Sequence, residues 1–234
     1  ASNTLTFAPD VTSLPIAITV NGDTILEPDE TFTVGLTGEV NAVISDASAT
    51  GTIENDDVNT RPDVSAGGAE TVDEGSPFTR AGSFTDPDPQ EWEATVDYGD
   101  GGGPEPLTLT GNTFQLAHTY ADDGEFTVTV TVDDGLEIGS HSFLVTVENV
   151  DPAVDAGPPK TIFAGTQFTS SGSFTDPGAD TWTATVDYGD GSGTQPLTLN
   201  ADKTFALSHT YATEDTYTVT VTVTDDDGGV GFDT

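Results

Sequence analysis

Cysteine and methionine are absent from this 234-residue chain, and cationic side chains are scarce. Without cysteine the chain can form no disulfide, no thiol nucleophile and no cysteine-ligated zinc site. Only 4 lysine and arginine residues stand against 41 acidic residues, which gives a formal net charge of −37. Such a chain repels nucleic-acid phosphates and anionic lipid headgroups, so we expect neither nucleic acid nor a membrane surface as its partner.

Long apolar runs, an initiator methionine and a signal peptide are also missing. No segment approaches the roughly 18 consecutive apolar residues of a membrane span, so we expect no membrane insertion. We expect the sequence to be an interior or processed piece of a longer protein.

High charge with few large apolar residues can indicate disorder, but the apolar residues here follow a strand pattern. FTVTVTV at 126–132 and YTVTVTV at 217–223 place aromatic and valine side chains on one face and threonine on the other. No stretch has the 3.6-residue helical period. The sequence therefore predicts an all-β fold, with further strands expected at 5–7, 15–20, 31–36, 49–54 and 143–147.

An internal repeat organises the chain after residue 58. TVDYGDG occurs at 95–101 and again at 185–191, an offset of 90 residues, and PLTL recurs at 106–109 and 196–199. Several short strands separated by glycine and aspartate turns within each repeat are typical of a two-sheet sandwich. The sequence thus predicts two similar β-sandwich modules in tandem.

Both repeats resemble PKD (polycystic kidney disease) modules. The shared motifs are the openings at 62–67 and 152–157, SFTDP, a tryptophan, VDYGDG, HTY and an acidic turn; the first copy also has VDEG at 72–75. The family usually has W-D-F-G-D-G where this chain has V-D-Y-G-D-G. The resemblance implies immunoglobulin-like sandwiches at 58–150 and 151–234, of a kind common in large extracellular proteins. The second copy has no counterpart of 143–150, so we expect it to lack its last strand.

Residues 1–57 resemble the C-terminal half of a Calx-beta module. The matching segments are LTFAPD at 5–10, Gly22-Asp23, EPDETF at 27–32 and GTIENDD at 51–57. We therefore expect tandem immunoglobulin-like sandwiches of which the first and last are incomplete. A missing strand leaves an open sheet edge, which either reflects a fragment boundary or is completed by a neighbouring chain.

Calcium is the cofactor that the acidic loops suggest, because Ca²⁺ takes several carboxylate oxygens in flexible geometry. The Calx-beta resemblance implies a site at Asp23, Glu27, Glu54, Asp56 and Asp57. The PKD resemblance implies a second type of site in the DP loops, at Asp86 and Asp88 and at Asp176 and Asp180. The alternative for every one of these positions is a solvated acidic turn.

Catalysis is not expected. The chain has no G-x-S-x-G, no phosphate-binding loop and no dinucleotide fingerprint. His118 and His209 each precede a tyrosine in HTY, and the repetition favours a structural corner made by Tyr120 and Tyr211.

We therefore predict a structural or adhesive rod segment of a large bacterial cell-surface or secreted protein. A filament subunit completed by strand exchange with other copies and stabilised by calcium is a finer form of this prediction. Weaker ideas are calcium sensing by residues 1–57 and an accessory carbohydrate-binding segment of a secreted hydrolase. In the latter, Trp92 and Trp182 would stack on a polysaccharide, although a sheet-face role suits their repeated position better.

Overall fold

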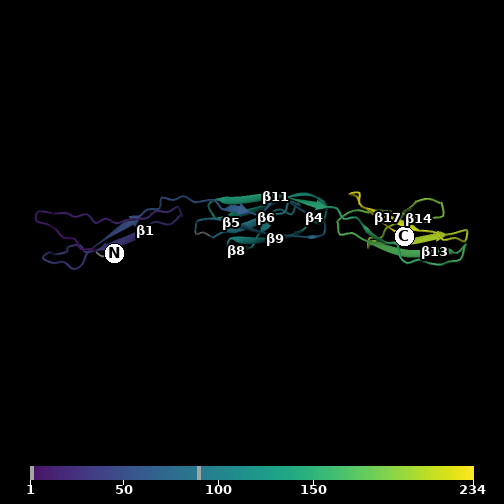
Figure 1. The fold of residues 1–234 in the computed structure, drawn as a ribbon, viewed down its shortest axis with the longest axis horizontal. Coiled ribbons are helices and arrows are strands. Elements are labelled where there is room, and N and C mark those ends of the chain that lie inside the picture. Colours follow the sequence, from purple (N-terminus) through teal and green to yellow (C-terminus); the bar gives the residue numbers. More distant parts are fainter. Residues whose placement is uncertain (1–2, 89–90) are drawn as a thin grey trace. The chain divides into compact units, whose positions relative to one another are not determined.

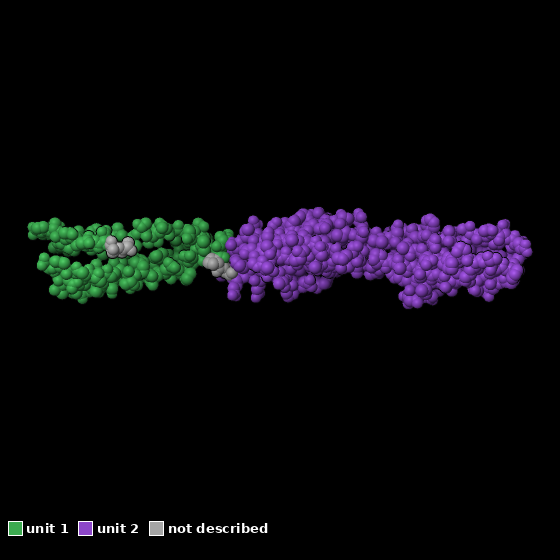
Figure 2. Space-filling view, turned by 60° about the horizontal axis from the view of Figure 1, so that its bottom comes forward, with its two compact units in different colours: residues 1–60, 87–90 green, residues 61–86, 91–234 purple. Residues whose placement is uncertain are grey.

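The computed structural model describes residues 3–88 and 91–234, and it contains β-strands but no helix in those ranges (Figure 1). None of the described residues therefore forms a helix that could cross a membrane. The prediction of an all-β fold is confirmed. The chain divides into two compact units, residues 1–60 with 87–90 and residues 61–86 with 91–234 (Figure 2).

The first unit contains one two-stranded antiparallel sheet, β1 (Glu30–Gly35) with β2 (Ser48–Ile53). Phe32 lies opposite Gly51, and its ring occupies the space that a side chain at Gly51 would need. No residue from 3 to 60 is buried, and Figure 2 shows open space between the segments of this unit. Residues 3–60 thus provide half of a sandwich without the facing sheet that would cover its apolar side chains.

The strands expected at 5–7 and 15–20 are not formed. Ile16, Ile18 and Val20 keep the alternating spacing of a strand, but each is about half exposed, at 49, 47 and 52 %. A strand is defined by a hydrogen-bonded neighbour, and no described segment pairs with residues 15–20. This part of the prediction was wrong because alternation specifies two faces and does not supply a partner strand.

The second unit begins with a complete two-sheet sandwich. One sheet has the order β4 (Glu70–Asp73), β11 (Ile138–Glu148), β10 (Gly124–Asp133), β6 (Glu93–Asp97), β7 (Glu105–Pro106). The other has the order β3 (Asp63–Ser65), β5 (Pro77–Thr85), β9 (Thr113–Thr119), β8 (Leu109–Thr110). The alternating valines of β10, Val128, Val130 and Val132, are fully buried between the sheets, which confirms that they share one face of the strand as predicted.

A second sandwich follows with the same plan. Its sheets have the orders β15 (Gln195–Leu197), β14 (Thr183–Asp187), β17 (Thr220–Thr224), β18 (Val230–Asp233) and β12 (Ala153–Asp155), β13 (Gln167–Thr175), β16 (Thr204–Thr210). Phe174, Phe205 and Leu207 from one sheet and Val221 and Val223 from the other form the buried centre.

The two sandwiches differ where β11 runs in the first. There the end of β11 pairs with β10 on one side and, in parallel, with β4 on the other. In the second sandwich β18 corresponds only to the start of β11. Residues 217–219 and 161–163 consequently have no ladder, so the strand predicted at 217–223 begins only at Thr220.

The HTY motif forms a corner in both sandwiches. The Tyr120 hydroxyl donates to the Tyr98 carbonyl at 3.1 Å, and the Tyr211 hydroxyl donates to the Tyr188 carbonyl at 3.0 Å. The His118 ring stacks on Tyr98 with centroids 4.2 Å apart. The predicted structural role of these residues is confirmed, because the hydroxyls and rings are engaged within the protein.

Candidate metal centre

Three backbone and side-chain contacts join the two sandwiches of the second unit. The Ala179 N–H donates to the Ala121 carbonyl at 2.7 Å. In the segment between the sandwiches, the Val150 N–H donates to Oε1 of Glu74 at 2.8 Å, and Nδ2 of Asn149 donates to Oδ2 of Asp225 at 3.1 Å. The joint between the two sandwiches is therefore held by hydrogen bonds.

A cluster of three carboxylates lies in this joint. Glu74 follows β4 of the first sandwich, whereas Asp176 and Asp180 belong to the loop between β13 and β14 of the second. One carboxylate oxygen of each residue lies within 4.8 Å of the other two. Glu74 is 0 % exposed and Asp180 is 7 % exposed, so two of the three charges are removed from water. The structure thus brings together two predicted metal ligands, Asp176 and Asp180, and adds Glu74.

The hydrogen bonds of these carboxylates are incomplete. Asp176 accepts from the Gly178 N–H at 2.9 Å and from Nε1 of Trp182 at 2.8 Å. In contrast, Oε2 of Glu74 and both carboxylate oxygens of Asp180 are buried and accept no hydrogen bond from any described residue. Buried polar atoms normally have partners, and all three of these atoms are acceptors. These oxygens therefore need a donor, a proton or a cation that the described side chains do not supply.

Cationic side chains do not fill this gap. The ion pairs of the described residues are Arg80–Glu70, His118–Asp100 and His209–Asp190, and none includes the cluster. Nζ of Lys203 donates to the backbone carbonyl of Asp176 at 2.8 Å and lies 3.9 Å from the centroid of the Trp182 ring. The lysine therefore supports the loop and its tryptophan without an ion pair to the cluster.

Burial and the proximity of these carboxylates raise the pKa values of Asp180 and Glu74. Burial, contact with Asp176 and the charge of Glu74 raise the pKa of Asp180 to about 7. Burial also raises the pKa of Glu74, against the lowering effect of the Val150 hydrogen bond. Two carboxylates about 5 Å apart repel each other by roughly 3 kcal/mol at an effective dielectric constant near 20. A proton on Asp180 relieves part of this repulsion, and a divalent cation would relieve more of it.

Gly178 lets the loop approach the cluster closely. A Cβ atom at this position would collide with the carboxylates of Asp180 and Glu74. Glycine at this position leaves the space between the DP loop and Glu74 to the carboxylate oxygens. The prediction did not include Glu74. The available signal was the repeat itself, in which the position 90 residues after Glu74 is Ala164.

More exposed acidic groups continue from the cluster. Asp180, Asp226 and Asp227 form one group of oxygens within 4.8 Å, and Asp122, Asp123 and Asp227 form another. The charges of Asp122 and Asp123 contribute to a raised pKa at Asp227, after desolvation as the first cause. Because these carboxylates are largely exposed, water can solvate them without an ion.

The Calx-beta positions are less closely grouped. Burial and the charges of Asp56, Asp23 and Asp88 raise the pKa of Asp57, so these residues share one neighbourhood in the first unit. Among the described residues, however, no three of them bring their oxygens within 4.8 Å, and neither Glu27 nor Glu54 joins such a group. Calcium binding at these five positions therefore stays a prediction.

The other DP-loop positions serve the backbone and the tryptophan. Asp88 is 1 % exposed and accepts hydrogen bonds from the N–H groups of Leu26 and Thr60, at 2.8 and 2.7 Å. Asp86 accepts from Nε1 of Trp92 at 2.8 Å, which repeats the Trp182–Asp176 bond. Asp97 and Asp187 cap their own turns by accepting hydrogen bonds from the Gly99 and Gly189 N–H groups.

Both tryptophans lie against their own module. Trp92 packs edge-on against Phe84 with centroids 5.3 Å apart, and Trp182 lies 5.5 Å from Phe174. Each indole is partly buried and uses its N–H group within the protein. This geometry favours a structural role over the sugar contact that the sequence left open.

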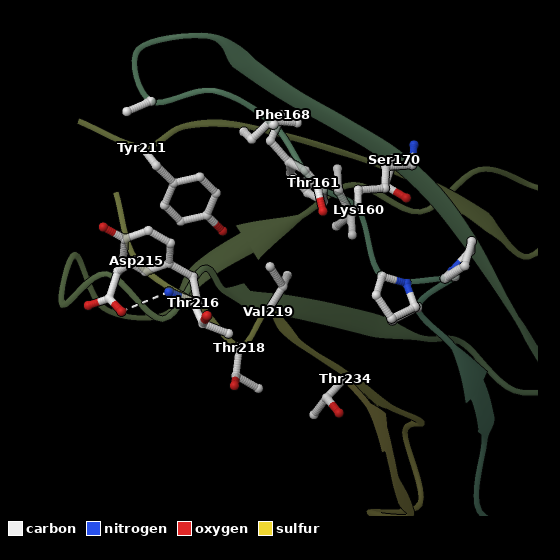
Figure 3. A pocket seen from close by; sticks show the side chains of 18 of the residues that line it. Lys160, Thr161, Phe168, Ser170, Tyr211, Asp215, Thr216, Thr218, Val219 and Thr234 are labelled. Carbon is white, nitrogen blue, oxygen red and sulfur yellow. Dashed lines mark hydrogen bonds between the residues drawn. The ribbon is translucent and has the colours of Figure 1, made fainter. Parts of the chain in front are cut away.

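A groove of about 530 Å³ opens in the second sandwich where the first has the end of β11. Figure 3 shows Phe168, Tyr211 and Val219 along its lining, with Thr234 at its edge. Val219 is partly exposed, whereas Val128, its counterpart in β10, is fully buried. The groove is therefore the uncovered part of the sandwich core.

Comparison with solved structures gives immunoglobulin-like and fibronectin-like tandems at low similarity. A chimeric titin Z1Z2 carrying a peptide from decorin is 15% identical, with a TM-score of 0.33, covering 75% of this chain and 96% of that one. Fibronectin(III)-like modules of Clostridium thermocellum CbhA are 15% identical, with a TM-score of 0.30, covering 74% and 90%. A search of curated proteins gave no match.

Comparison with family models gives a direct assignment. Residues 59–147 and 149–234 each match the PKD domain, and residues 1–57 match the Calx-beta domain. The matched ranges correspond to the two sandwiches and to the first, half-formed unit. The predicted resemblance is confirmed: the chain belongs to the PKD domain family.

Proposed function

We propose that the chain is a non-catalytic structural or adhesive segment of a large extracellular or cell-surface protein. PKD modules are typically non-catalytic, and PKD and Calx-beta modules are typically extracellular. The observation that carries the proposal is the bonded joint, in which the segment 149–150 is tied to both sandwiches and Ala179 is bonded to Ala121. Modules fixed to each other in this way transmit force and hold a defined spacing.

The mechanical role can be tested by pulling on single molecules between handles at the two ends of the chain. We expect two unfolding events, one for each PKD module, and each event should release tens of residues. A force peak is expected because each module must break its antiparallel strand ladders before it can extend. A chain that extends smoothly, without force peaks, would contradict a load-bearing role.

The groove supports the finer proposal of strand exchange. The occupant we propose is the 15–20 segment of a second copy, because Ile16, Ile18 and Val20 are exposed with the spacing of Phe143, Val145 and Val147 in β11. An added strand would gain ladder bonds to residues 217–219 and cover the exposed core. Calcium would support such a filament by reducing the repulsion between chains of net charge −37.

Sedimentation velocity across chain concentrations, with and without Ca²⁺, tests this exchange. We expect concentration-dependent oligomers that Ile18→Asp abolishes and that Leu136→Asp, at an exposed position outside the segment, leaves intact. A monomer at all concentrations in both conditions contradicts strand exchange but leaves the mechanical role standing. Retention on chitin that is lost in Trp92→Ala would instead favour the carbohydrate-binding alternative.

A further inference from the structure

We propose that Glu74, Asp176 and Asp180 bind one divalent cation of the calcium class across the joint of the two PKD modules, and that this ion locks the joint. The inference deepens the proposed structural function and rests on it only for its mechanical consequence. Ion binding itself is measured independently of force transmission or assembly, so failure of the two proposals can be told apart.

The unpartnered atoms identify the chemistry of the ligand. Oε2 of Glu74 and both carboxylate oxygens of Asp180 are buried, and all of them can only accept when ionised. An anionic ligand could not satisfy them, and a neutral donor would leave the repulsion between the carboxylates in place. A cation complements every one of these atoms at once, and no arginine, lysine or histidine of the described residues takes that place.

The donor set indicates the class of cation. It consists of carboxylate oxygens without sulfur or imidazole, which suits the hard cations Ca²⁺ and Mg²⁺ and disfavours zinc or copper. We favour Ca²⁺ because it tolerates irregular and bidentate carboxylate geometry, whereas Mg²⁺ requires a near-octahedral arrangement. Water would complete the coordination from the side of the exposed Asp226 and Asp227.

The internal repeat shows that these carboxylates belong to the joint. Asp176 has a counterpart in Asp86, and both bind the tryptophan of their own module. The other two ligands have no acidic counterpart: Ala164 stands at the position of Glu74, and Gln90 stands at that of Asp180. Glu74 and Asp180 are therefore not part of what the two modules have in common. Both lie where the two modules meet.

The consequence of binding follows from where the ligands originate. Glu74 comes from the first module, and Asp176 and Asp180 come from the second. An ion held by both sides stabilises the docked joint over the separated modules, because separation divides its ligands. Without the ion, the same carboxylates repel one another and weaken the joint.

The first experiment measures the ion directly on the 234-residue chain. Tb³⁺ occupies oxygen sites of the calcium type and luminesces when a nearby indole is excited. We expect Tb³⁺ luminescence that Ca²⁺ displaces and that Trp182→Phe removes, because the Trp182 indole is bonded to Asp176. Trp92→Phe is the matched control, since Trp92 makes the same bond in the first module to Asp86.

The second experiment removes ligands. Glu74→Gln and Asp180→Asn should each weaken Ca²⁺ binding by isothermal titration by about 10–100-fold, at least the effect of losing an outer-shell partner. Glu93→Gln, at an exposed acidic position that belongs to none of these groups, should keep the wild-type affinity. In EDTA, Glu74→Gln should raise Tm because it removes repulsion, which also shows that the variant folds.

A third experiment detects the locked joint. Since the chain has no cysteine, Ser140→Cys and Ala206→Cys give one exposed spin-label position in each module. We expect the distance distribution between the labels to narrow with Ca²⁺, and Glu74→Gln to abolish this change. Absence of Ca²⁺ and Tb³⁺ binding, or binding unchanged in both ligand variants, would overturn the proposal and leave a proton as the occupant of the cluster.

Discussion

The indole nitrogen of Trp182 lies 2.8 Å from Oδ2 of Asp176, so the tryptophan of the second module is bonded to a carboxylate of the joint. In the first module Trp92 makes the same bond to Asp86. The same Trp–Asp pair thus occurs in both modules. In the first module it contributes to packing only, whereas in the second it also holds a carboxylate that lies in the joint.

We therefore expect replacement of the two tryptophans to have different effects on the Ca²⁺ dependence of stability. Either Trp→Phe change removes one charge-assisted hydrogen bond, and we expect it to lower the free energy of unfolding by about 1.5–3 kcal/mol. Urea denaturation measures this effect. Only Trp182→Phe should also alter the dependence of stability on Ca²⁺, and equal Ca²⁺ dependence in both variants would contradict the link between Trp182 and the joint.

The tyrosine corner gives a second prediction. Tyr120→Phe leaves the buried Tyr98 carbonyl without its hydroxyl donor, and we expect a cost of about 1–2 kcal/mol. Tyr211→Phe should cost a similar amount, because the Tyr211 hydroxyl bonds to Tyr188 in the same way. Denaturant unfolding followed by near-ultraviolet circular dichroism reports the change, and unaltered stability in both variants would exclude a structural role for this corner.

Gly178 gives a third prediction, which concerns space at the joint. A methyl group there would collide with the carboxylates of Asp180 and Glu74, so Gly178→Ala should destabilise the docked modules by about 1–3 kcal/mol. Gly68→Ala is the control, since a Cβ at Gly68 would meet no atom within 4 Å. Scanning calorimetry should show a lower Tm for Gly178→Ala only, and an equal effect of both changes would point to a general effect of replacing a loop glycine instead of the joint.

The decrease in stability at acid pH gives a fourth prediction. Hydrogen bonds from the Ser192 hydroxyl and N–H and from His209 lower the pKa of Asp190 to about 2. A carboxyl with a lowered folded-state pKa stabilises the fold above its unfolded pKa of about 3.9, and this stabilisation is lost as the pH falls through 2. Asp190→Asn should therefore reduce the loss of stability between pH 4 and pH 2, measured by denaturant unfolding at each pH. A variant with the same pH slope as the parent chain would contradict the assignment.

Strand faces were predictable from the sequence because their cause is local. The alternation in FTVTVTV places Val128, Val130 and Val132 on one side of any extended chain, and they are buried in the structure. Turn caps such as Asp97 were predictable for the same reason, since donor and acceptor lie two residues apart. Pairing was not predictable in this way: residues 15–20 alternate as well and remain without a neighbouring strand.

The candidate site was predictable only in part. The DP loop drew attention to Asp176 and Asp180, but Glu74 lies 102 residues before Asp176 and gave no separate signal within its own segment. Whether an acidic side chain is exposed or buried beside others depends on which loop packs against which, and the pKa and the unpartnered oxygens of Asp180 follow from that packing.

The sequence by itself therefore determined the all-β class, the tandem PKD modules, their inward faces and the excess of negative charge, because period, motif and composition are properties of the chain alone. The tertiary structure decided which carboxylates meet. Docking of the second module against the first buries Glu74 and Asp180 without hydrogen-bond donors for their free oxygens, and burial turns ordinary surface charges into a cluster that needs a counter-charge.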